Sequence, residues 1–263
     1  MEFDKLFKKI YMKVLNGIKP LLKLFYILTP KHPIFREGKF TTGDRNRDYL
    51  YFRNKFRLSP DWLKDHRYYF SQNNRGFGED AFHAAWFWIF SEYKITKALE
   101  IGVYRGQVIS LWAIIAKNLG QKILVTGISP LTDVGDSVSE YPSLDYHNDV
   151  AKNFEYFEVN TPNLIKEFST SKNAKAVIED GSWDLIYIDG SHDYKTVLSD
   201  YRSAVKGLRI GGILVMDDSS LHTNFHISFK GHPGPSKVLK ADANPVLKPI
   251  LSVGHNNFFV KKK

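Results

Sequence analysis

The sequence predicts an α/β fold in which a mostly parallel β-sheet is covered by helices on both faces. From about residue 78 onward, short apolar runs typical of buried strands alternate with longer segments of helical periodicity. Two of the apolar runs end abruptly in aspartates, and ligands bind outside the carboxyl ends of strands in parallel sheets. The chain has 263 residues and no cysteine, which excludes a disulfide framework and thiolate metal ligands.

The elements follow in order from the same patterns. The aromatic and apolar run GEDAFHAAWFWIFSEY predicts a helix over 78–93. After it, strands are predicted over 97–102, 122–128, 163–169, 183–190 and 211–218, and helices over 106–120, 143–157, 171–180 and 194–208. Ser143 is the predicted cap of its helix. The tail PILSVGHNNFFVKK indicates two short strands around a turn at 254–257.

The chain is expected to divide into a basic N-terminal arm with a connector, residues 1–75, and a domain over 76–263. Residues 1–57 hold 14 Lys and Arg against 5 Asp and Glu, whereas the rest of the chain holds 23 of each. The surplus positive charge therefore belongs to the arm, which suggests an anionic partner. The following stretch, 30–75, is rich in Pro, Gly, Arg and aromatics and is interpreted as a partly helical connector that wraps the core.

Apolar residues from Phe3 to Ile18 recur at helical spacing and are interrupted by lysines, which predicts an amphipathic helix too broken to span a bilayer. Two placements stay open: docking on the domain, or lying on an anionic membrane surface through residues 1–29. We expect a cytoplasmic location. If the second placement holds, the protein would lie at the inner face of a membrane as a peripheral protein. Nucleic acid is not an expected partner, because the domain is charge-neutral and acidic at its site. Whether the chain forms a homo-oligomer stays open.

The stretch ALEIGVYRGQ follows the first predicted strand and opens a helix. Gly102 and Gly106 allow a sharp turn and a close approach of backbone to ligand. Glu100 lies at the strand end, which suits a cationic or amine-bearing ligand better than a diphosphate. The pattern also differs from the G-x-G-x-x-G fingerprint of dinucleotide sites. We expect a cofactor at this turn.

The stretches LIYIDGSHDY and GGILVMDDSS each carry an apolar run into acidic residues, Asp189 in the first and Asp217 and Asp218 in the second. If the two strands are neighbours, their ends lie about 4.8 Å apart. Carboxylates that close raise one another's pKa unless a cation lies among them, and a hard divalent ion with oxygen ligands satisfies this condition. The alternative is that the aspartates cap the segments that follow.

His192 is the predicted general base, because neutral imidazole titrates near working pH and this residue lies three positions after Asp189. Asp193 is the alternative base. The stretch NFHISFKGHPGPS is expected to form a loop that lines the acceptor site. It has no regular metal-ligand spacing, and no choice is made among the histidines that follow the second acidic strand: His222, His226, His232 and His255.

The blocks LEIGVYRG and WDLIYIDGSHDYKTVLSDYRSAVKGLRIGGILVMDD resemble class I S-adenosylmethionine-dependent methyltransferases, over roughly residues 78–263. The second block resembles the small-molecule O-methyltransferase branch that includes macrocin-type sugar methyltransferases. The resemblance implies a Rossmann-like methyltransferase fold with a mostly parallel seven-stranded sheet. It also implies S-adenosylmethionine as cofactor, held by Glu100, Gly102, Tyr104, Gly106 and Ser129.

Ser129 stands where the family usually has an acidic residue for the ribose hydroxyls, and Asp133 is its possible substitute. The related metal-dependent O-methyltransferases bind magnesium at three acidic positions that match Asp189, Asp217 and Asp218, so the resemblance implies Mg²⁺ or Mn²⁺. The implied reaction is methyl transfer to a hydroxyl of a sugar, glycan or glycosylated metabolite. Two rivals stay open: a hydroxylase-like relative, whose iron would favour two histidines and one carboxylate, and a non-catalytic cofactor-binding adaptor.

Overall fold

The computed structural model describes residues 35, 43–134, 141, 143–242 and 244–262. The predicted helix within residues 1–29 lies outside the described residues. From residue 39 onward the chain forms one compact unit. Within the part of the chain that the structure describes, no helix has the length and apolar character needed to cross a membrane.

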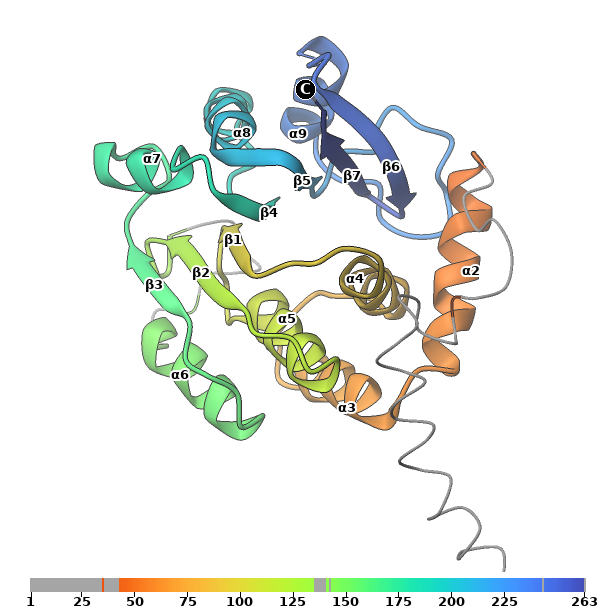
Figure 1. The fold of residues 1–263 in the computed structure, drawn as a ribbon, viewed down its shortest axis with the longest axis vertical. Coiled ribbons are helices and arrows are strands. Elements are labelled where there is room, and N and C mark those ends of the chain that lie inside the picture. Colours follow the sequence, from red (N-terminus) through yellow and green to blue (C-terminus); the bar gives the residue numbers. More distant parts are fainter. Residues whose placement is uncertain (1–34, 36–42, 135–140, 142, 243, 263) are drawn as a thin grey trace, which may run out of the picture. The chain divides into compact units, whose positions relative to one another are not determined.

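Seven strands form one sheet in the order β3-β2-β1-β4-β5-β7-β6 (Figure 1). Pairing is parallel from β3 through to β5, whereas β7 runs antiparallel to both of its neighbours. The predicted mostly parallel seven-stranded sheet is confirmed. The strands are β1 Lys97–Ile101, β2 Leu124–Ser129, β3 Asn163–Lys166, β4 Trp183–Ile188, β5 Leu208–Met216, β6 Leu247–Val253 and β7 Asn256–Lys261.

Helices cover both sides of this sheet. In Figure 1, α3, α4 and α5 lie on one side, and α7, α8 and α9 lie on the other. The helices in the described residues are α2 Arg45–Arg57, α3 Asp61–Ser71, α4 Asp80–Glu92, α5 Gln107–Asn118, α6 Tyr146–Tyr156, α7 Lys172–Ile178, α8 Tyr194–Gly207 and α9 Pro233–Ala241. The partly helical connector thus contains α2 and α3. Helix α2 packs against α4 and β6 within the same compact unit as the sheet.

The core has two layers because side chains alternate along each strand. On one face, Ile186 and Leu214 pack into a buried apolar cluster with Tyr201 of α8. On the other face, Tyr187 meets Trp86 of α4 edge to face, with ring centroids 5.2 Å apart. This packing fixes the central strands, and therefore the positions of the residues that follow their ends.

Two local predictions were wrong. Asp145, and not Ser143, caps α6, because its carboxylate accepts a hydrogen bond from the backbone N–H of Asn148 at 3.0 Å. Helix α9 was also missed, since its start lies inside the stretch interpreted as loop. Pro233 is its first residue, and a proline at this position is typical of a helix start.

Candidate functional site

The ends of β1, β4 and β5 meet at one edge of the sheet because the three strands are in register. Ile101 pairs with Ile188, and Ile188 pairs with Met216. The pattern continues one residue further, where the Asp189 N–H donates to the Ile101 carbonyl at 2.8 Å and the Asp217 N–H donates to the Ile188 carbonyl at 3.0 Å. Asp189 and Asp217 therefore emerge side by side, as the sequence predicted for neighbouring strands.

The glycine turn after β1 packs directly on the backbone after β4. Gly102 has φ +100°, and a Cβ at this position would lie 2.1 Å from the Asp189 carbonyl oxygen. Gly106 has φ +79° and precedes the first residue of α5. Both positions need glycine, the first for space and backbone conformation and the second for conformation. The turn therefore brings the start of α5 close to the acidic edge.

Glu100 lies at the end of β1 with only 3% of its surface exposed. The backbone N–H of Ile109 in the first turn of α5 lies close enough to this carboxyl to oppose the rise of its pKa, whereas the second oxygen, Oε2, has no hydrogen-bond partner among the described residues. Burial raises the pKa of Glu100 well above its usual value, and the nearby Asp217 carboxylate raises this pKa further. An amine or other donor in the adjoining space would satisfy the free oxygen.

The remaining predicted cofactor residues lie around the same turn. The Tyr104 hydroxyl donates to the Asn74 carbonyl at 2.9 Å, and its ring stacks on Phe77 with centroids 5.5 Å apart. Ser129 follows Ile128, whose carbonyl accepts from the Gly102 N–H at 2.9 Å, so the end of β2 lies beside the glycine turn. The predicted substitute Asp133 is exposed, next to residues that the structure does not describe.

The three aspartates form a continuous cluster, but their roles differ. The Asp189 and Asp217 carboxyl groups lie close enough for each to affect the pKa of the other. Burial raises the pKa of Asp189 well above its usual value, as does the adjacent Asp217, and burial also raises the pKa of Asp217. Asp218 has φ +50°, a left-handed conformation that is uncommon outside glycine. This conformation turns the chain back immediately after β5.

Histidines approach Asp218 from two segments. The His192 Nε2 lies 3.1 Å from Asp218 Oδ2, and the His232 Nε2 lies 3.6 Å from the same oxygen. His232 reaches this place because the Asp218 carbonyl accepts from its backbone N–H at 2.9 Å. Its neighbour Gly231 passes so close that a Cβ there would lie 2.1 Å from the Asp218 carbonyl oxygen.

A third histidine closes the cluster from the turn between β6 and β7. His255 Nε2 lies 3.3 Å from Asp217 Oδ1 and 3.8 Å from Asp218 Oδ1. Sequence reasoning did not select His232 or His255, because each is brought to the site by contacts with residues far along the chain. The other two histidines of this region, His222 and His226, are exposed.

The alternative of simple helix capping applies to Asp193 and not to the predicted metal ligands. The Asp193 carboxylate accepts from the backbone N–H of Thr196 at 3.0 Å and caps α8. These bonds lower the pKa of Asp193. Asp193 is therefore committed to the helix, which leaves His192 as the better placed of the two predicted bases.

The donor set fits a divalent metal ion. Among the described residues, two groups place their ligand atoms within 4.8 Å of one another: Asp217, Asp218 and His255, and His192, Asp218 and His232. Asp217 Oδ1 is buried and has no hydrogen-bond partner within the part of the chain that the structure describes, and His255 Nε2 of the first group lies 3.3 Å from it. Asp189 belongs to neither group, although its carboxyl group lies beside that of Asp217.

Comparison with known proteins supports the methyltransferase prediction. Residues 99–219 match a family described as a methyltransferase domain, which covers both the glycine turn and the acidic strand ends. An uncharacterised protein, R132 of Acanthamoeba polyphaga mimivirus, is 28% identical over 124 residues, or 46% of this chain. The match spans about half, 50%, of that relative's length.

Solved structures confirm the predicted Rossmann-like methyltransferase fold. The SAH-bound methyltransferase PaMTH1 of Podospora anserina has a TM-score of 0.57 and 16% identity, over 86% of this chain and 99% of that one. An O-methyltransferase of Bacillus cereus in complex with SAH has a TM-score of 0.54 and 15% identity, over 82% and 98%. The narrower resemblance to macrocin-type sugar methyltransferases stays a prediction.

Proposed function

We propose that this chain is an S-adenosylmethionine-dependent O-methyltransferase that uses a divalent metal ion and acts on a hydroxyl of a sugar, glycan or glycosylated metabolite. The observation that carries the proposal is the meeting of the glycine turn after β1 with the carboxylates after β4 and β5. The methyltransferase-domain match covers these same residues, and both structural relatives described above hold SAH, the demethylated form of the cofactor.

In this proposal the cofactor lies on the turn formed by Gly102 and Gly106. The free Glu100 Oε2 accepts from its amino group, and Ser129 contributes one hydrogen bond to the ribose. Tyr104 stacks on Phe77 beside the turn and borders the cofactor. A cationic sulfonium is favoured at this edge because the surrounding side chains are acidic.

Asp217 and Asp218 would hold the metal ion, with Asp189 beside them. When bound, the ion supplies a Lewis acid that holds the acceptor hydroxyl and lowers its pKa. The chain's own contribution is to hold the carboxylates in place through the strand register, and to keep them apart from bulk water. The positive charge of the ion would also offset the free-energy cost of burying several carboxylates close together.

His192 is the proposed base. Its Nε2 faces Asp218 Oδ2 at 3.1 Å, at the mouth of the acidic edge. As the acceptor oxygen forms its bond to the methyl carbon and the carbon–sulfur bond breaks, the hydroxyl proton passes to the imidazole, and Asp218 stabilises the resulting cation. Alignment of the three reacting atoms accounts for most of the remaining rate acceleration.

The test measures methyl transfer from labelled S-adenosylmethionine to a panel of glycosides and sugar-containing metabolites. We expect transfer to a hydroxyl that chelator abolishes and Mg²⁺ or Mn²⁺ restores. Cofactor binding by calorimetry is measured in parallel. Tight cofactor binding without transfer to any acceptor would favour the non-catalytic adaptor, and full activity in chelator would remove the metal from the reaction.

One observation favours a second candidate, an iron-dependent oxygenation on the same scaffold. His192, His232 and Asp218 form a two-histidine, one-carboxylate group, which is the donor set of many non-heme iron oxygenases. Oxygen consumption by the Fe²⁺-loaded protein in the presence of a methyl acceptor distinguishes the two reactions. We expect none beyond that of free Fe²⁺.

A further inference from the structure

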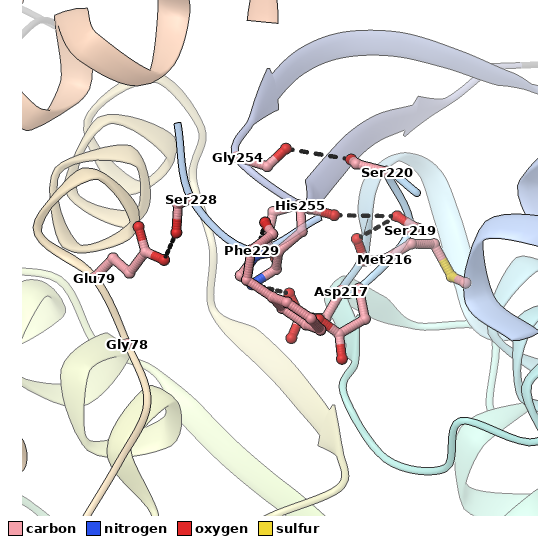
Figure 2. A network of polar contacts seen from close by, with 12 residues as sticks. Gly78, Glu79, Met216, Asp217, Ser219, Ser220, Ser228, Phe229, Gly254 and His255 are labelled. Carbon is pink, nitrogen blue, oxygen red and sulfur yellow. Dashed lines mark hydrogen bonds and ion pairs between the residues drawn. The ribbon is translucent and has the colours of Figure 1, made fainter. Parts of the chain in front are cut away.

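His255 has a geometry that the proposed transfer does not explain. It occupies the turn between β6 and β7, and its side chain is only 11% exposed. Figure 2 shows the imidazole beside Phe229 and Asp217, with the backbone of the turn joined to the segment that follows β5. The turn between β6 and β7 thus places a buried imidazole at the acidic edge.

The hydrogen bonds of the ring define its tautomer. Nδ1 lies 3.1 Å from the Phe229 carbonyl oxygen, and because a carbonyl only accepts, Nδ1 carries a proton (Figure 2). Nε2 points the other way, at Asp217 Oδ1 and Asp218 Oδ1. Metal-bound histidines typically show this arrangement, with the distal ring nitrogen donating to a backbone carbonyl or carboxylate.

The ring is also held rigidly. Phe82 packs edge-on against it with centroids 4.6 Å apart. The backbone N–H of Ser219 donates to the His255 carbonyl at 3.0 Å, and the Ser220 hydroxyl donates to the Gly254 carbonyl at 3.2 Å. The histidine is therefore tied to the two residues that follow Asp218. Such preorganisation is what a metal ligand needs.

Distance distinguishes a ligand from a simple ion pair. A charge-assisted N–H···O bond is usually about 2.7–2.9 Å long, whereas Nε2 and Asp217 Oδ1 are 3.3 Å apart. Two ligand atoms that each lie about 2.0–2.2 Å from one ion are roughly 3.0–3.5 Å apart. Asp217 Oδ1 also has no hydrogen-bond partner among the described residues.

We propose that His255 Nε2 is a ligand of the divalent ion at the ends of β4 and β5, together with Asp217 and Asp218. The inference rests on the proposed function only in assuming a divalent ion at that edge. An imidazole donor favours first-row transition ions such as Mn²⁺, Fe²⁺, Co²⁺ or Zn²⁺, whereas Mg²⁺ favours oxygen ligands. The site would then select a transition ion over Mg²⁺ more strongly than a purely carboxylate site does.

Calorimetric titration of the full chain with Co²⁺, Mn²⁺ or Mg²⁺ alone tests this without cofactor or acceptor. We expect His255→Ala to weaken Co²⁺ and Mn²⁺ binding by about 10–100-fold or more, since even loss of an outer-shell partner costs that much, and to change Mg²⁺ binding less. His226→Ala is the matched control, because His226 is exposed and its Nδ1 also meets a backbone carbonyl, that of Asn224 at 3.1 Å. It should bind as the wild type does.

Tighter metal binding by His255→Ala than by the wild type would overturn the proposal. If His255 were only a cationic partner of the carboxylates, its removal would strengthen the binding of every divalent ion, because one positive charge would be lost. His255→Gln serves as a second variant, and circular dichroism melts show whether each variant is folded. Unchanged affinity in both folded variants would also exclude a ligand role.

Pulsed electron paramagnetic resonance of the Mn²⁺-loaded chain detects imidazole nitrogen bound to the ion. This signal would not depend on His255 if that residue had only a structural role. We expect imidazole ¹⁴N coupling in the wild type and in His226→Ala, and its loss in His255→Ala. No ¹⁴N coupling in the wild type would overturn the proposal whether or not the variants fold. Coupling that survives in His255→Ala but disappears in His232→Ala would assign the ligand to the other histidine. Intact coupling without methyl transfer would instead contradict the proposed function alone.

Discussion

The imidazole rings of His192 and His232 stack face to face, with centroids 3.7 Å apart and planes inclined by 17°. Both Nε2 atoms face the same Asp218 oxygen. His232 thus holds the ring plane of the proposed base beside Asp218.

Replacement of the base tests this arrangement. We expect His192→Ala to lower kcat by about 10²–10⁴, the usual effect of a positioned base, with cofactor affinity nearly unchanged. His232→Phe keeps an aromatic ring stacked on His192 and should therefore cost less in kcat than the loss of the base itself. Single-turnover transfer across pH provides the measurement. A fully active His192→Ala variant would show that this histidine only packs at the start of α8.

Gly102 lies so close to the Asp189 backbone that adding a side chain at position 102 should lower the stability of the fold. We expect Gly102→Ala to destabilise the chain by more than the roughly 1–2 kcal/mol of a left-handed alanine, because Asp189 must also move. Metal binding should weaken with it. Gly120→Ala is the matched control, since Gly120 has φ +68° and open space around a Cβ. Equal melting temperatures of the two variants would contradict the inferred contact.

The pKa of Glu100 predicts a pH dependence of stability in the chelated, cofactor-free chain. Its folded pKa is raised, so the folded state holds this proton more tightly than the unfolded state does. Stability should therefore fall as pH rises above about 4.3, the usual pKa of glutamate, until the raised pKa is passed. Glu100→Gln should flatten this decline and weaken cofactor binding. Glu155→Gln is the control, because Glu155 is exposed. Thermal melts across this pH range should show the same decline in this variant as in the wild type.

Of the two placements that stay open for residues 1–29, the one on an anionic membrane surface predicts membrane binding that depends on this arm. The full chain should sediment with vesicles of anionic lipid at low salt and release at high salt, because the interaction is electrostatic. A chain without residues 1–29 should lose this binding and still melt cooperatively, since the compact unit begins at residue 39. If the full chain does not bind such vesicles at low salt, the membrane placement is wrong and docking of the helix on the domain remains.

The central strands could be predicted from sequence because their signals are local. The run that ends at Ile188 and the run that ends at Met216 are apolar throughout, and each is followed at once by an aspartate. Parallel pairing then places Asp189 and Asp217 side by side without any knowledge of the loops. For the same reason, the positions of the glycine turn and of Glu100 at the end of β1 could be predicted, whereas their contact with a cofactor stays a prediction.

The histidine side of the site could not be predicted because it depends on long-range contacts. His232 arrives through a backbone bond to Asp218 and through the close passage of Gly231, neither of which leaves a periodic pattern. His255 arrives because β7 inserts antiparallel between β5 and β6. A sequence shows the strand and the turn, but not the pairing partner.

The place of β7 also determines when the site can exist. Among the described residues this strand is the last element in sequence, yet it lies between β5 and β6 in the sheet. During synthesis, which proceeds at about 5–20 residues per second, β6 emerges before it and has no partner in the sheet until Asn256–Lys261 follows. The acidic residues at Asp217 and Asp218 are therefore made well before the strand that brings His255 to them. A nascent chain that stalls before Asn256–Lys261 is made would carry the glycine turn and the carboxylates, but not the strand that holds His255 beside them.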